Sequence, residues 1–159
     1  EVRFVVMGYH EEKQRQLDMR YIRMAKIWAE NSYCIRRQVG ALIVKDKMII
    51  SDGYNGTPSG FENICEDEAT GKTKPYVLHA EANAIISASR RDMVGSTLYL
   101  VGRDARTGAL LGDATSCAMC RRQVINAGIS RVIIRRTETE FQIVDVHDWV
   151  HQEDDVPAL

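Results

Sequence analysis

The sequence lacks the features that would place it in a membrane or on a nucleic acid. No apolar run approaches the roughly 20 residues of a membrane span, so we expect no membrane partner. Its 21 basic and 22 acidic residues leave a net charge of −1, which makes a nucleic acid partner unexpected. A secretory signal is missing too, because Arg3 interrupts the short apolar run 2–7, and Met7 is an alternative start.

Internal repeats and low-complexity linkers are also missing. A chain of 159 residues has room for one complete hydrophobic core. We therefore predict a single domain over 1–159, with an N-terminal extension at 1–13 and a frayed acidic tail at 151–159. The 45% hydrophobic and 27% charged residues are typical of a soluble globular protein.

Cysteine is scarce, with Cys34 and Cys65 far apart and Cys117 and Cys120 forming a Cys-x-x-Cys pair. Without a secretory signal, such a pair is more often metal-binding or redox-active than a structural disulfide. We therefore expect a cytoplasmic protein.

Apolar periodicity predicts helices and strands that alternate along the second half of the chain. In order, we expect a helix over 14–31, a hairpin from 39–44 and 48–50, a long loop over 55–78, a helix over 79–92, a strand over 97–101, a helix over 117–127 ended by Gly128, and strands over 132–134 and 141–146. This alternation favours an α/β sandwich with helices on both faces of a sheet.

The most informative motif is His79-Ala80-Glu81 together with Cys117-Ala118-Met119-Cys120. Residues three apart share a helix face, so both sulfurs can reach one metal, and Ser116 stands where the helix needs an N-cap. Three protein ligands leave one tetrahedral position open, as in a catalytic zinc site. Glu81 then stays off the metal and can transfer protons.

Two other interpretations of these cysteines remain open. A redox pair would need neither His79 nor Glu81. A closed structural zinc site would need a fourth ligand, which Cys34 or Cys65 could supply.

With Gly53-Tyr54-Asn55-Gly56 added to these motifs, the chain resembles the cytidine deaminase superfamily over about residues 17–135, and within it the deoxycytidylate (dCMP) deaminases. The resemblance implies a three-layer αβα sandwich around a mixed five-stranded sheet. It also implies one catalytic Zn²⁺, hydrolysis of dCMP to dUMP and ammonia, and a homo-oligomer, either a dimer or a hexamer.

The resemblance also implies roles for individual residues. His79, Cys117 and Cys120 would bind the metal, and Glu81 would move protons to N3 of the base and to the departing ammonia. For the substrate, Asn55 would hold the sugar 3′-hydroxyl, the Ala80 backbone would contact the base amino group, Val39 would pack on the ring, and Arg36 would bind the phosphate.

The chain departs from the family pattern in four places. Ser116 replaces a proline, Ile134-Arg135 stands where many relatives have a tyrosine, and an insertion fills 101–115. This insertion is either an extended hairpin without a role or a segment that brings Arg103 or Arg106 to the pocket. Residues 66–78 hold neither His nor Cys, so we expect Cys34 and Cys65 to be buried free thiols and no second structural zinc.

Two alternatives to dCMP deamination follow. One is deamination of another base or nucleoside, such as cytidine, guanine or a tRNA adenosine. The other is a zinc-stabilised binding module without catalysis, although a purely structural site would gain nothing from Glu81.

Overall fold

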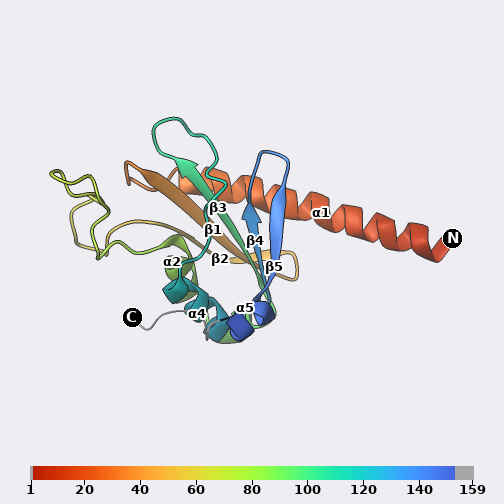
Figure 1. Cartoon of the computed structure of the whole chain (residues 1–159). Helices are drawn as coiled ribbons and strands as arrows, with labels where there is room; N and C mark the ends of the chain where they lie inside the picture. Colours follow the sequence, from red (N-terminus) through yellow and green to blue (C-terminus); the bar gives the residue numbers. More distant parts are fainter. Residues whose placement is uncertain (1, 153–159) are drawn as a thin grey trace.

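The computed structural model describes residues 2–152, with side chains from residue 11 onward. One mixed sheet has the strand order β2-β1-β3-β4-β5 (Figure 1). Its strands are β1 Arg37–Lys45, β2 Met48–Tyr54, β3 Thr97–Asp104, β4 Arg131–Arg135 and β5 Phe141–Asp145. Within this sheet β3 and β4 run parallel, and the other neighbouring pairs run antiparallel.

Helices cover both faces of the sheet, as the sequence predicted. The helices are α1 Val2–Ala29, α2 Ala80–Ile86, α3 Arg90–Met93, α4 Ala118–Ala127 and α5 Val146–Gln152. The long helix α1 lies on one face, and α2, α4 and α5 lie on the other (Figure 1). No helix within residues 2–152 is long and apolar enough to span a membrane.

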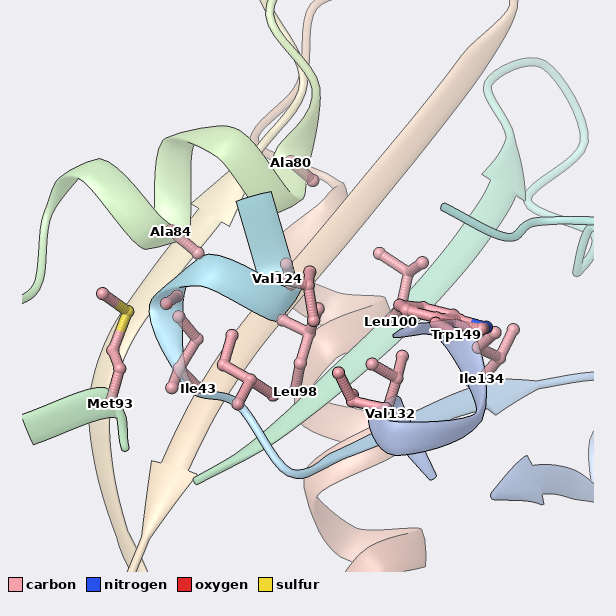
Figure 2. Close-up of a cluster of buried hydrophobic side chains, with 14 residues drawn as sticks. Ile43, Ala80, Ala84, Met93, Leu98, Leu100, Val124, Val132, Ile134 and Trp149 are labelled. Atoms are coloured by element: carbon pink, nitrogen blue, oxygen red, sulfur yellow. The ribbon is translucent and has the colours of Figure 1, made fainter. Parts of the chain in front are cut away.

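Successive residues of the central strands enter different cores, because side chains alternate between the two faces of a sheet. Leu42 and Tyr99 pack in the cluster beneath α1, whereas Ile43 and Leu98 pack in the cluster beneath α2, α4 and α5. Figure 2 shows this second cluster, with Val124 of α4 close to the buried strand side chains. The predicted αβα sandwich with a mixed five-stranded sheet is therefore confirmed.

The predicted hairpin is confirmed at β1 and β2, which extend beyond the predicted runs. Asp46 and Lys47 both have positive φ, 50° and 63°, as a two-residue turn between twisted antiparallel strands requires. The last two residues of β2, Gly53 and Tyr54, lead directly into Asn55, so the hairpin positions one of the predicted substrate residues.

The predicted helix boundaries need correction in three places. The predicted helix 79–92 is wrong in extent, because α2 ends at Ile86 and Ser89 starts α3 by accepting the Asp92 N–H. The first helix begins at Val2, so the extension at 2–13 is helical, and it ends at Ala29. In the predicted tail, 151–152 close α5, and 153–159 lie outside the described residues.

The prediction that Cys34 and Cys65 are free thiols is wrong, because they form a disulfide across 31 residues of sequence. Beside it, buried Glu66 accepts the backbone N–H groups of Ile35 and Arg36 through Oε1, at 3.0 and 3.2 Å. These contacts bring the long loop back to the start of β1. Disulfides persist mainly in oxidising compartments, so the cytoplasmic location stays a prediction.

Candidate active site

The three predicted metal ligands lie together where α2 and α4 begin. His79 Nδ1 is 3.5 Å from Cys117 Sγ and 3.3 Å from Cys120 Sγ. All three ligand atoms lie within 4.8 Å of one another. Cys34 and Cys65 are not members of this cluster, so it has the three protein ligands of an open site rather than four.

In both helices the N-cap residue is a predicted metal ligand. His79 is the N-cap of α2, and Cys117 is the N-cap of α4, where its Sγ accepts the Cys120 N–H at 3.5 Å. The prediction that Ser116 is the cap is therefore wrong. Ser116 is buried one residue earlier, and its hydroxyl has no hydrogen-bond partner in the described part of the chain. Helix N-termini carry partial positive charge, which favours the thiolate form of a cysteine in the first turn.

The geometry and the donor types of this cluster fit zinc. A tetrahedron with Zn–S bonds of about 2.3 Å and Zn–N bonds of about 2.0–2.1 Å has N–S edges of roughly 3.5 Å. The two observed N–S distances, 3.5 and 3.3 Å, match those edges. Two thiolates and an imidazole are also the ligand types that zinc prefers over oxygen donors.

Metal binding at this site is linked to proton release. Burial raises the pKa of the Cys120 thiol, and the nearby Glu81 carboxylate and Cys117 raise it further. A metal must therefore displace the thiol proton, and its affinity falls as the pH falls.

Glu81 lies in the first turn of α2 and is only 3% exposed. It lines a cavity of about 230 Å³ together with His79, Ala80 and Cys117. It does not belong to the cluster of three ligands. The Glu81 carboxylate therefore lines the same cavity as the metal ligands without being one of them. A proton-transfer role requires this arrangement.

Val39 and Asn55 line the same cavity from the hairpin. The Asn55 side chain joins the two strands, because Oδ1 accepts the Val39 N–H and Nδ2 donates to the Arg37 carbonyl, both at 2.8 Å. One lone pair of Oδ1 and one N–H of Nδ2 remain for another partner. Its backbone contacts hold this amide in a fixed direction.

Gly53 lets α2 approach the hairpin closely. A Cβ at this position would collide with the Ala80 carbonyl oxygen and would lie 2.6 Å from the Ala84 nitrogen. The Asn83 side chain also donates to the Tyr54 carbonyl at 2.8 Å. These contacts set the distance between Asn55 and Glu81 across the cavity.

The cavity is lined by Arg37 rather than by the predicted Arg36. Arg36 precedes β1, and its side chain is exposed. Arg37 and Val39 are two residues apart on one strand and so share a face, a period that could have identified Arg37 from the sequence. The Arg37 guanidinium donates to Asp113 at 2.8 Å, and this contact lowers the pKa of the Asp113 carboxyl.

The insertion at 101–115 forms an extended hairpin. It continues β3 to Asp104, whose carboxylate accepts the N–H groups of Arg106 and Thr107 at the turn. Neither Arg103 nor Arg106 lines the cavity, and Arg103 instead donates to Gln38 at 2.6 Å. The end of the insertion does reach the cavity, through Ala114 and Thr115.

Arg135, the last residue of β4, does not line the cavity. Its buried side chain donates to the carbonyl oxygens of Thr137 and Glu138, at 3.0 and 2.6 Å. It therefore stabilises the turn between β4 and β5.

Two further cavity residues, Thr73 and Val77, come from the long loop and carried no signal in the sequence.

Comparison with known proteins agrees with this geometry. The profile of the cytidine and deoxycytidylate deaminase zinc-binding region matches residues 15–136. A deoxycytidylate deaminase of Mycobacterium phage D29 is 31% identical over 73% of this chain and 91% of its own length. The human deoxycytidylate deaminase is 34% identical over 71% of this chain and 61% of its own length.

Two solved structures have this fold. The dCMP deaminase of cyanophage S-TIM5, crystallised with dCMP and dUMP, is 32% identical with a TM-score of 0.61, covering 84% of this chain and 88% of that one. The 1.6 Å structure of a cytidine deaminase from Burkholderia pseudomallei, with 19% identity and a TM-score of 0.52, shares the fold. The chain therefore belongs to the cytidine and deoxycytidylate deaminase family, whose zinc-binding region it contains.

Proposed function

We propose that this protein hydrolyses dCMP to dUMP and ammonia. The observation that carries the proposal is the buried carboxylate of Glu81, which lines a small cavity together with ligands of a three-ligand metal cluster. Relatives with 31–34% identity are deoxycytidylate deaminases, and the similar cyanophage enzyme was crystallised with dCMP and dUMP. The chain spans most of the phage relative but only 46% of the yeast one.

In this proposal His79, Cys117 and Cys120 hold the zinc ion. Zinc bound there supplies Lewis acidity, which makes water a nucleophile near neutral pH. Glu81 takes a proton from water and passes it to N3 of the pyrimidine. It then takes the proton of the hydroxyl group added at C4 and delivers it to the departing amino group, so that the carboxylate is regenerated. Its burial next to the cavity favours such proton transfer, because bulk water cannot compete for the carboxylate.

The rest of the cavity orients the nucleotide in this proposal. The Val39 side chain packs against the base, and the Ala80 backbone contacts the exocyclic amino group. Asn55 holds the sugar 3′-hydroxyl with the hydrogen-bonding capacity that its bonds to β1 leave over. Arg36 and Arg37 are the candidates for the phosphate.

We also propose that the protein assembles into a homo-oligomer. Ile86 on α2 is 83% exposed and Met119 on α4 is 47% exposed. These two helices pack against each other, so both side chains are candidates for such an interface. A nucleic acid substrate remains disfavoured by the net charge of −1.

The test is ammonia release by zinc-loaded protein from dCMP, CMP, deoxycytidine, cytidine, guanine and adenosine, compared side by side. We expect preferential release from dCMP. Preference for an unphosphorylated substrate would overturn the nucleotide part of the proposal. Inactivity on every compound, with zinc bound, would favour a macromolecular substrate or a non-catalytic module.

The role of Glu81 is tested with Glu81→Gln, which preserves the size of the side chain. We expect this variant to retain zinc and to lose about 10²–10⁴-fold in turnover, because the amide cannot carry the proton. Turnover near the wild-type value in a zinc-loaded variant would exclude the proton-transfer role.

A further inference from the structure

The cavity that holds the metal cluster is also lined by one permanent positive charge. Among the described residues that line the cavity, Arg37 is the only arginine, and no lysine lines it. Its guanidinium does not stand free, because Asp113 Oδ2 lies 2.8 Å from Nη2. Asp113 belongs to the segment 101–115, which was predicted to be an insertion. The Asp113 carboxylate therefore pairs with the Arg37 guanidinium, the charged group that a bound anion would otherwise contact.

The backbone around Asp113 is fixed, although its side chain is exposed. On the side of β4, Arg136 Nη1 donates to the carbonyl oxygens of Gly112 and Ala114, at 2.6 and 3.3 Å. The Asp113 side chain itself is 68% exposed, and that of Arg37 is 51% exposed. A small rotation of the carboxylate can therefore open the ion pair while the insertion keeps its position.

We propose that Asp113 is an internal competitor for Arg37, which the phosphate of a nucleotide displaces, and that this exchange sets the preference for nucleotides over nucleosides. The inference rests on the proposed function and adds a specificity residue to it. A phosphate dianion offers more charge and more acceptor oxygens than a carboxylate, and a guanidinium can bind it through two parallel hydrogen bonds.

Opening the Arg37–Asp113 ion pair so that phosphate can bind costs little free energy. Ion pairs between exposed side chains are weak, since water solvates both partners. The displaced carboxylate also keeps a cation nearby, because Arg136 contributes to the low pKa of Asp113. A nucleoside, which has no phosphate, leaves the Arg37–Asp113 pair closed and gains nothing from Arg37.

The experiment compares Asp113→Asn, Arg37→Ala and the double variant with the wild type. The measured quantity is the ratio of kcat/KM for dCMP to kcat/KM for deoxycytidine. We expect Asp113→Asn to raise this ratio several-fold and Arg37→Ala to lower it roughly 10-fold or more, as expected for loss of a charge-assisted contact. In the Arg37→Ala background, Asp113→Asn should have no further effect, since the two residues act through one contact.

Two control variants separate this contact from general charge effects. Glu68→Gln removes one exposed negative charge from the long loop, outside the cavity, and should leave the ratio unchanged. Arg36→Ala removes the neighbouring arginine, the other candidate for the phosphate, which does not line the cavity, and it should lower the ratio less than Arg37→Ala does. If Arg36→Ala removes the preference for dCMP while Arg37→Ala preserves it, the inference is overturned.

Calorimetric binding of dUMP and deoxyuridine to the same zinc-loaded variants gives a readout that does not depend on turnover. Tighter binding of dUMP, with unchanged binding of deoxyuridine, is expected for Asp113→Asn. Equal or weaker dUMP binding would overturn the competition. A wild-type protein that binds dUMP without deaminating dCMP would contradict the proposed function alone, so the two failures are distinguishable.

Discussion

Two parts of the cavity wall are built in different ways. At the metal cluster, Cys120 and Glu81 are buried in the first turns of helices, and His79 and Cys117 are the N-caps of those helices. In another part of the wall, Arg37 faces Asp113 of the segment 101–115, and both side chains are largely exposed. The comparison suggests that regular elements fix the chemistry, whereas loops and exposed charges adjust which substrate reaches it.

Replacing a metal ligand should cause the largest loss of activity. Cys117→Ser replaces a thiolate with a poor zinc ligand and also removes the sulfur that caps α4. We expect loss of zinc and of all measurable deamination, determined as zinc per chain and ammonia release. The matched Cys34→Ser variant should keep one zinc ion per chain. Full zinc occupancy in Cys117→Ser would show that the cluster is not the metal site.

The intermediate effect concerns the spacing between the hairpin and the helices. A Cβ at Gly53 would collide with the backbone of α2, and one at Gly40 would collide with the backbone of α1. We expect Gly53→Ala and Gly40→Ala each to destabilise the fold by about 1–3 kcal/mol or more, measured by denaturant unfolding.

The two glycine variants should differ in turnover per folded molecule. Gly53→Ala moves the helix that carries Glu81, so its kcat should fall, whereas Gly40→Ala displaces only α1 on the opposite face of the sheet. Equal kcat values in the two variants would mean that the position of α2 is not critical for catalysis.

The smallest effect on turnover is expected from the disulfide. Cys65 accepts the Lys74 N–H through its carbonyl oxygen, and Thr73 beside it lines the cavity. Removing the bond in the double variant Cys34→Ser/Cys65→Ser should loosen this wall, raise KM several-fold and leave kcat nearly unchanged. Steady-state kinetics measures both, and thermal unfolding should show a loss of about 2–4 kcal/mol.

Reductant supplies the control for this prediction. It should raise the KM of the wild type and leave the double variant unaffected, because that variant has no bond to reduce. A similar response in both proteins would place the effect of reductant at the zinc thiolates instead.

Short-range patterns in the sequence predicted the parts of the site that local geometry decides. The His-x-Glu and Cys-x-x-Cys spacings gave the metal cluster, and Asp46-Lys47 between two apolar runs gave the hairpin. The alternation of helices and strands along the second half of the chain predicted helices on both faces of the sheet, and each face has its own core. Within each motif, neighbours within about one helical turn, or one strand period, fix which side chains share a face.

The parts that failed depend on residues distant in the sequence or on small differences between neighbours. Nothing local couples Cys34 to Cys65, whose pairing requires the whole loop to fold back. Ser116 and Cys117 are both acceptable caps, and the choice follows from bringing Cys117 to His79. Ser89 is compatible with one continuous helix, and only the hydrogen bond that its side chain accepts from the Asp92 N–H marks the start of α3.

The disulfide gives the chain two cysteine pairs with opposite requirements during maturation. Cys34 and Cys65 must lose electrons to reach their final state, whereas Cys117 and Cys120 must remain thiolates. An oxidant that forms the first bond also endangers the second pair, which lies close together beside His79. Zinc bound to those thiolates protects them from oxidation. A protein with both the disulfide and the zinc ion is therefore obtained when the metal binds before the oxidant acts.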